Sequence, residues 1–156
     1  MPYSEFGRLF YVQHQVTWTC SKCKEQHRHI ERLGYALTLT PKGQALLPCI
    51  TAYHRETGVE IRCSNCRSNT RRTRVKALTR APEALFIQLA RFNFDASIAS
   101  STKTRHVAAV PDSLNMSRWC VDTKPPARYV LQAVIVYSGT LKSGHYKAFV
   151  QNDGRV

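Results

Sequence analysis

The chain is poor in acidic residues and has no long apolar run. It holds ten Asp and Glu against 23 Lys and Arg, which gives a formal net charge of +13. This balance predicts attraction to a polyanion or to an acidic partner. No apolar stretch approaches the roughly 18 residues of a membrane-spanning helix, and the first ten residues lack the apolar core of a signal peptide. We therefore expect an intracellular protein with no membrane segment.

What is present describes a folded chain of one domain's length. The 156 residues are 43% hydrophobic and 10% aromatic, a composition typical of a packed core and not of a disordered segment. Six cysteines in a reducing compartment are thiols or metal ligands more often than disulfides.

Four of these cysteines form two pairs with metal-ligand spacing. Cys20 and Cys23 make one C-x2-C pair, and Cys63 and Cys66 make a second. Two such turns complete a tetrahedral thiolate site, so the spacing predicts a structural zinc ion. A pair of disulfides and a degenerate site that holds no metal are the alternatives. Four protein ligands leave no open position on the metal, so we expect this zinc to stabilise the fold and not to activate water.

The other metal-type side chains have ordinary explanations. His14, His27 and His29 lie near the first pair, and we predict that they are solvated, because four cysteines already satisfy the ion. Cys49 lies in the apolar face of a predicted helix and is expected to be a buried thiol, because no glycine turn at a helix N-terminus lowers its pKa. Cys120 is assigned no role.

The segments between these motifs read as strands and one helix. Alternating apolar residues in Leu33 to Leu39 predict an antiparallel strand with one buried face, and Gln44 to His54 has helical spacing that ends before Gly58. Val59 to Arg62 is a short predicted strand. Ala81 to Asp95 is predicted to be a central strand, followed by a small-residue loop from Ala96 to Thr102.

One segment is strongly basic. Residues 61–80 contain no carboxylate and seven cations: Arg62, Arg67, Arg71, Arg72, Arg74, Lys76 and Arg80. A basic run beside a zinc ribbon could follow a phosphate backbone. The alternative is a solvated ribbon edge, where Lys and Arg prevent unwanted strand pairing. The run has little aromatic interleaving, so we favour the ribbon edge and do not expect a nucleic-acid partner.

A predicted hairpin places a histidine where it can react. Leu131 to Tyr137 is an apolar strand, Ser138 to Gly144 is a loop, and Tyr146 to Val150 alternates as the returning strand. His145 then stands at the start of that strand, rigidly held and reachable by solvent, as a general base must be. Taken alone, a histidine in such a place more often simply ends a strand.

The whole stretch from Tyr129 to Val150 resembles the histidine box of the ubiquitin-specific proteases, which has a tyrosine, an apolar strand, a glycine loop and then glycine, histidine and tyrosine. Arg91 and Phe92, which follow a proline and an apolar strand, resemble another of the family's motifs. The likeness covers Thr17 to Gly154. It implies an α+β fold, the papain-like palm of these proteases with an antiparallel sheet (81–156) and zinc-ribbon fingers (17–80), and a partial catalytic domain over residues 1–156.

The resemblance also implies roles for three residues. His145 would be the general base that takes the proton of a cysteine thiol, and Gly144 and Tyr146 would contact the substrate, ubiquitin or a ubiquitinated protein. In the family the nucleophilic cysteine lies in a helical thumb before the first cysteine pair. The 19 residues before Cys20 contain no cysteine, so the thumb is expected to be absent and the isolated chain inactive.

The third member of the catalytic triad is also expected to be missing. Asn152 and Asp153 lie on the order of 23 Å from His145 if the strand is straight, and we predict that they form a turn. The sequence is therefore interpreted as part of a thiol-dependent deubiquitinase. A catalytically inactive ubiquitin-binding remnant is the first alternative, and a basic zinc-ribbon nucleic-acid-binding protein is the second.

Overall fold

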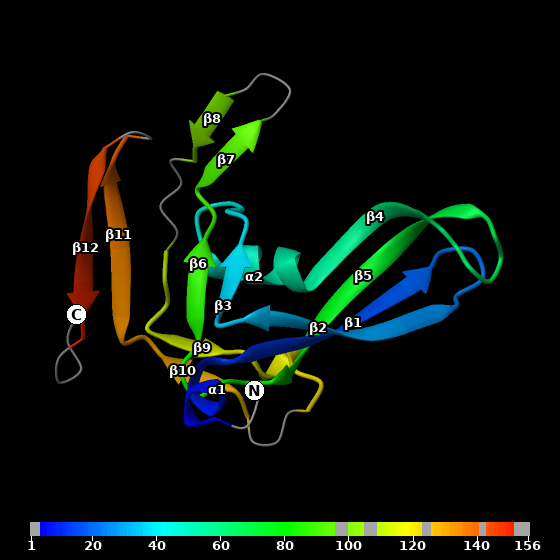
Figure 1. The fold of residues 1–156 in the computed structure, drawn as a ribbon, viewed down its shortest axis with the longest axis horizontal. Helices are drawn as coiled ribbons and strands as arrows, with labels where there is room; N and C mark the ends of the chain where they lie inside the picture. The colour runs from blue at the N-terminus through cyan, green and yellow to red at the C-terminus, as the bar shows by residue number, and fades with distance from the viewer. Residues whose placement is uncertain (1–3, 96–99, 105–108, 123–125, 141–142, 152–156) are drawn as a thin grey trace.

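The computed structural model describes residues 4–95, 100–104, 109–122, 126–140 and 143–151. It combines short helices with mostly antiparallel strand pairs, as the α+β prediction requires. A long four-stranded sheet extends to one side of a central body, and a two-stranded hairpin lies at the opposite side (Figure 1). The two chemical motifs of the sequence therefore occupy opposite ends of the molecule.

The four-stranded sheet has the order β2-β1-β5-β4 and is antiparallel throughout. Its strands are β1 (Val12–Cys20), β2 (Gln26–Gly34), β4 (Arg55–Arg62) and β5 (Asn69–Arg80). The predicted ribbon edge is wrong, because β5, which carries most of the basic run, is an inner strand. β4 begins at Arg55, earlier than the predicted Val59, and Gly58 (φ +81°) lies in a register shift between Glu56 and Val59.

The core lies under α2 (Leu46–His54), where the sheet meets the body. Its buried members are Val12, Leu37, Leu39, Leu46, Cys49, Ile50, Leu78, Met116, Trp119 and Ala127. Full burial of one Leu or Ile side chain contributes about 1.5–3 kcal/mol, so this cluster dominates the stability of the body. The helix starts two residues after the predicted Gln44, and Leu47 on its outer face is 49% exposed. The predicted buried thiol at Cys49 is confirmed.

The strand predicted over Leu33 to Leu39 is divided and is partly parallel. β2 ends at Gly34 (φ +99°), and β3 (Ala36–Leu39) then pairs in parallel with β6 (Phe86–Leu89). The predicted antiparallel pairing is therefore wrong for this segment, although the alternation is right, since Leu37 and Leu39 are fully buried. Pairing between distant segments leaves no local trace in the sequence.

The predicted central strand over Ala81 to Asp95 is also divided. β6 is followed by β7 (Phe92–Asp95), which forms a separate antiparallel pair with β8 (Ser100–Lys103). The predicted loop therefore ends earlier than Thr102. Arg91 lies between the two strands, and its Nε donates to the Thr104 carbonyl oxygen over 3.2 Å.

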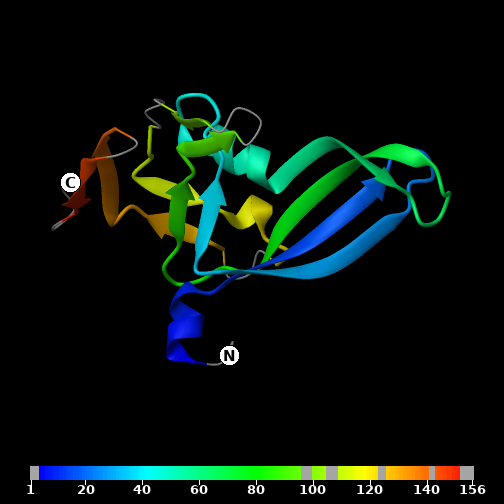
Figure 2. The same cartoon turned by 45° about the horizontal axis from the view of Figure 1, so that its top comes forward.

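The remaining elements surround the body. They are α1 (Glu5–Phe10), β9 (Ser113–Asn115), the 3-10 helix η1 (Ser117–Trp119), β10 (Arg128–Val130), β11 (Ala133–Gly139) and β12 (Gly144–Val150). Ser4 caps α1 by accepting a hydrogen bond from the Gly7 amide over 3.0 Å, and the helix stands out from the body (Figure 2). Among the described residues, no helix has the length and apolar content needed to cross a membrane.

Candidate functional site: a thiolate cluster and a histidine hairpin

The structure brings the two cysteine pairs together at the far end of the four-stranded sheet. One turn joins β1 to β2 and the other joins β4 to β5, and both lie at the same end of the sheet (Figure 1). The Sγ atoms of Cys20, Cys23, Cys63 and Cys66 lie within 4.8 Å of one another. The Cys20–Cys66 and Cys23–Cys63 sulfurs are 4.0 and 3.7 Å apart. A tetrahedral zinc site with Zn–S bonds of about 2.3 Å requires sulfurs about 3.8 Å apart, so the four thiols fit the metal.

The backbone of each turn explains how the sulfurs converge. Lys24 and Arg67 directly follow the second cysteine of their pairs and adopt φ of 60° and 54°, the two positive values at non-glycine residues in the described part of the chain. The Cys20 amide donates to the Glu25 carbonyl, and the Cys63 amide donates to Ser68, each over 2.9 Å. The two turns thus have the same conformation. A left-handed residue bends the chain back so that both sulfurs of a pair face one point.

Hydrogen bonds at two of the four cysteines favour the thiolate form that a metal needs, whereas the pKa of the Cys23 thiol is raised. The Thr70 hydroxyl lies 3.3 Å from the Cys20 sulfur, and this hydrogen bond lowers the pKa of the Cys20 thiol to about 5. A hydrogen bond from the Ser68 amide lowers the pKa of the Cys66 thiol in the same way. The site therefore has the geometry of a metal-binding centre, with two thiols whose environment favours the thiolate.

Polar contacts link the two turns beside the sulfurs. Lys22 Nζ donates to Ser68 Oγ over 3.0 Å, and His27 Nε2 lies 3.1 Å from Ser64 Oγ. His27, predicted to be solvated, is thus half-buried and bonded across the turns, whereas His29 is exposed as predicted. These contacts add to the β1–β5 strand pairing that already joins the two halves of the sheet.

The hairpin that carries His145 forms as predicted, with nearly the predicted limits. β11 and β12 pair from Ala133–Val150 to Gly139–Gly144, and His145 lies opposite Ser138 as the second residue of β12. The backbone is tight at this point. A Cβ atom on Gly144 would collide with the Tyr137 hydroxyl and the Ser138 carbonyl oxygen, so only glycine fits beside the histidine.

The hairpin presents two different faces. His145 and Lys147 share one face, because side chains alternate along a strand, and His145 is exposed to solvent. Tyr146 lies on the other face, 72% exposed, with its ring centroid 4.9 Å from that of Tyr137. The Tyr137 ring also contacts Phe92 of β7, with centroids 5.5 Å apart. Because the His145 imidazole is exposed, a group that arrives from solvent and binds beside it can exchange a proton with it.

Four other residues are possible partners of His145 by residue type and are assigned no catalytic role: Cys49, Cys120, Asn152 and Asp153. Asn152 and Asp153 lie outside the described residues. Cys49 lies on α2, where its sulfur accepts from the Lys42 amide over 3.1 Å, and β3 and β6 lie between α2 and the hairpin in both views (Figures 1 and 2). Burial raises the pKa of the Cys120 thiol, which makes it a weaker nucleophile at neutral pH.

Sequence reasoning missed a buried polar cluster where the sheet joins α2. His14, predicted to be solvated, is 0% exposed, and it lies against His54. Lys76 of the basic run is 9% exposed and Arg72 is 6% exposed. The alternating sequence of β5 predicted that its cations share one face. It did not predict that this face would be covered by the rest of the protein.

Comparisons with known proteins assign this chain to one family. The family model described as ubiquitin carboxyl-terminal hydrolase matches residues 2–155. Ubiquitin carboxyl-terminal hydrolase 10 of Saccharomyces cerevisiae is 34% identical over 94 residues, which cover 59% of this chain and 12% of that protein. Probable ubiquitin carboxyl-terminal hydrolase 16 of Schizosaccharomyces pombe is 28% identical over 156 residues, covering 96% of this chain and 33% of that protein.

A solved structure also contains a chain with a similar fold. The SAGA DUB module bound to monoubiquitin contains a chain that superposes with a TM-score of 0.80 at 25% identity, covering 96% of this chain and 34% of that one. The present chain therefore belongs to the ubiquitin carboxyl-terminal hydrolase family. Within this family it has the fold of part of a ubiquitin-specific protease domain, with the four-stranded sheet as the fingers. It spans between 12% and a third of the length of the two curated relatives above.

Proposed function

We propose that this chain supplies the metal-bearing fingers and the histidine of a thiol-dependent deubiquitinase, which hydrolyses the bond after the C-terminal glycine of ubiquitin. The observation that carries the proposal is the family match over residues 2–155 together with an exposed His145 on a glycine-fixed hairpin. In this role His145 takes the proton of a cysteine thiol and later protonates the leaving amine. Gly144 and Tyr146 contact the ubiquitin tail.

The nucleophilic cysteine is proposed to lie outside the 156 residues. Four of the six cysteines belong to the metal cluster. Cys49 is 2% exposed in the core, and the Cys120 pKa is raised, so neither resembles a reactive thiolate. The chain alone is then inactive. The first alternative, a ubiquitin-binding remnant, also predicts that the isolated chain is inactive. The two differ in whether the neighbouring coding sequence contains a cysteine box.

Zinc is the metal proposed for the thiolate cluster, and residues 17–80 and 81–156 are proposed as the fingers and palm portions of the domain. Four sulfurs at tetrahedral separations suit zinc, which would hold the two turns together and supply no chemistry to the reaction. A thiolate site of this kind fits the expected intracellular, reducing compartment.

The nucleic-acid alternative is disfavoured by the surroundings of the basic run. Arg72 and Lys76 are buried, Arg74 pairs with Glu56 over 2.5 Å, and Arg71 lies 3.7 Å from Glu60. Four of the seven cations of the basic run are therefore buried or beside a carboxylate, which weakens the case for a run that follows a phosphate backbone.

Reaction with ubiquitin that carries a thiol-reactive group at its C-terminus tests the proposal. The purified, zinc-loaded chain should shift the NMR resonances of isotope-labelled ubiquitin but form no covalent adduct. An adduct that needs His145 and is lost in Cys49→Ser or Cys120→Ser would place the nucleophile inside this chain. Absence of any ubiquitin binding would overturn the proposed partner.

A longer product of the same coding region provides the test of His145 itself. If that product contains the cysteine box, His145→Ala should lower hydrolysis of a ubiquitin fluorogenic amide by roughly 10²–10⁴-fold, the typical contribution of a positioned general base. His29→Ala is the matched control, because His29 is an exposed histidine on β2. Equal activity of the two variants would remove His145 from the mechanism.

A further inference from the structure

Three buried titratable side chains meet where the fingers sheet joins α2, and the proposed reaction uses none of them. His14 on β1 is 0% exposed, His54 at the end of α2 is 2% exposed, and Lys76 on β5 is 9% exposed. The His14 and His54 ring centroids are 5.6 Å apart. Burial of ionisable groups is costly unless they are paired or neutral. The protonation of these two imidazoles therefore affects the attachment of the sheet to the body.

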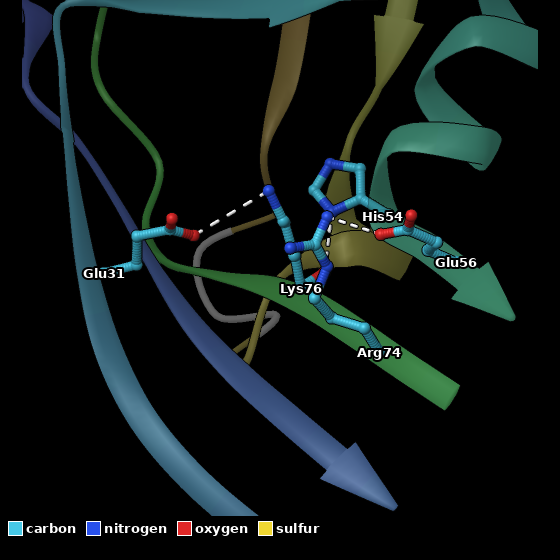
Figure 3. A network of polar contacts seen from close by, with 5 residues as sticks. All are labelled: Glu31, His54, Glu56, Arg74 and Lys76. Carbon is cyan, nitrogen blue, oxygen red and sulfur yellow. Dashed lines mark hydrogen bonds and ion pairs between the residues drawn. The ribbon is translucent and has the colours of Figure 1, made fainter. Parts of the chain in front are cut away.

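The hydrogen bonds define a neutral His54 with no place for a second proton. His54 Nδ1 lies 2.7 Å from the Lys76 carbonyl oxygen, which can only accept, so Nδ1 carries the proton (Figure 3). Nε2 of His54 and both ring nitrogens of His14 have no hydrogen-bond partner within the described part of the chain. A second proton on either ring would therefore find no acceptor.

The charges around the imidazoles oppose protonation as well. Tyr53 of α2 and Lys76 of β5 lie beside the imidazoles, and the charged neighbours of Lys76 are Glu31 of β2, Arg74 of β5 and Glu56 of β4. Both carboxylates are already engaged: Glu31 lies 3.7 Å from Lys76 Nζ and Glu56 pairs with Arg74 (Figure 3). Lys76 Nζ also lies 4.5 Å from the centre of the Tyr53 ring. A protonated His14 would thus be an uncompensated positive charge near Lys76.

The same side chains connect the sheet to the body. Tyr53 contacts the His14 ring with centroids 5.5 Å apart, and Trp119 of η1 stacks on His54 at 5.6 Å and 23°. His14 and Lys76 belong to the sheet, whereas His54 and Trp119 belong to the helices of the body. We propose that this cluster is a proton-sensitive junction, closed while both imidazoles are neutral and opened by proton uptake, so that acidification loosens the fingers on the body.

The direction of the effect follows from where each state binds protons. Burial lowers the pKa of His14 to about 3, with smaller contributions from repulsion by a protonated His54 and by Lys76, and burial also lowers the pKa of His54. In an open, solvated junction these pKa values return toward about 6.5. The open state then binds protons better, so closure is complete above pH 6.5 and weakens as pH falls. Between pH 7.5 and 5.5 the opening equilibrium constant rises about tenfold from His14 alone.

Amide hydrogen exchange of the full zinc-loaded chain tests the junction. After correction for intrinsic rates, amides of α2 and of β5 around Lys76 should open about tenfold more at pH 5.5 than at pH 7.5. His14→Phe, which fills the site without a titratable group, should reduce this increase, and His29→Gln should leave it unchanged. An unchanged pH response in His14→Phe, or in His14→Gln if the Phe variant does not fold, would overturn the proposal.

Two readouts on the unmodified protein keep the test independent of the variants. Imidazole nitrogen NMR should show a His14 ring that stays neutral at pH 5.5, and a His14 resonance that titrates near pH 6.5 would refute the junction. The Cys20 and Cys63 amides report on the metal turns. If they lose protection together with α2 in the same pH range, the acid response belongs to metal loss and the junction proposal fails.

Discussion

The fingers sheet is held by many more contacts with the rest of the chain than the histidine hairpin is. The fingers sheet has four strands, a thiolate cluster at one end and a buried polar junction at the other. The hairpin β11–β12 has two strands, every residue of β12 is exposed, and Ile135 and Val150 are 71% and 60% exposed. A two-stranded hairpin is at best marginally stable by itself. The proposed catalytic residue thus lies on the element that depends most on additional packing.

The largest change should come from breaking the thiolate cluster. Cys63→Ser removes one of four ligands, so the chain should lose its metal and the melting temperature should fall by roughly 10 °C or more, since a structural zinc contributes several kcal/mol. Metal analysis and calorimetry measure both effects. Cys120→Ser, which leaves the cluster intact, is the control. A Cys63→Ser chain that retains its metal and its melting temperature would show that the cysteines are not ligands.

Gly144→Ala should damage the hairpin and leave the fingers unchanged. The added Cβ collides with Tyr137 and Ser138, so the strand pairing near His145 should loosen by about 1–3 kcal/mol. Amide exchange in β11 and β12 measures this loss, with α2 as an internal reference and Ser138→Ala as the matched control. Equal protection of the hairpin in Gly144→Ala and in the parent would contradict the close approach described above.

Acidification should act on the fingers junction and spare the hairpin. With the His14 pKa lowered to about 3 in the folded chain and near 6.5 in the unfolded chain, lowering the pH from 7.5 to 5.5 should cost about 1.4 kcal/mol of unfolding free energy. Urea titrations at the two pH values measure it, with metal content checked at each. Constant stability across this range would mean that His14 is not buried in solution.

The smallest change should come from the exposed ion pairs of the sheet. Arg74 and Glu56 are 31% and 47% exposed, so Glu56→Gln should cost below about 1 kcal/mol, and less at high salt. Glu60→Gln, whose partner Arg71 is 77% exposed, should cost still less. Urea titrations in low and high salt rank the two variants. A larger loss in Glu60→Gln would contradict the ranking by burial.

The features that the sequence predicted well are local ones. Each cysteine pair needs only a four-residue turn, and the hairpin around His145 needs only adjacent strands and a glycine at Gly144. Both signals lie within one short segment of chain, so composition and spacing specify them. The same holds for the buried Cys49, which a single apolar helix face identifies.

The features that sequence reasoning missed depend on distant contacts. The parallel pairing of β3 with β6, and the covered cations of β5, arise only when segments far apart in the chain meet. His14 looked like one more polar residue, because its neighbours His54 and Lys76 are contributed by α2 and β5. Alternation shows which side chains share a face, but it does not show which face another element will cover.

The parallel pairing of β3 with β6 also has a consequence for how the chain reaches its fold. β3 can pair only after β6 has been positioned, and α2, β4 and β5 lie between the two strands in the sequence. Contacts that close long loops slow folding, because the entropy of closure is lost before the contact forms. A metal that joins the two cysteine turns early would shorten this search. The thiolate cluster would then set the rate at which a newly made chain matures, as well as its final stability.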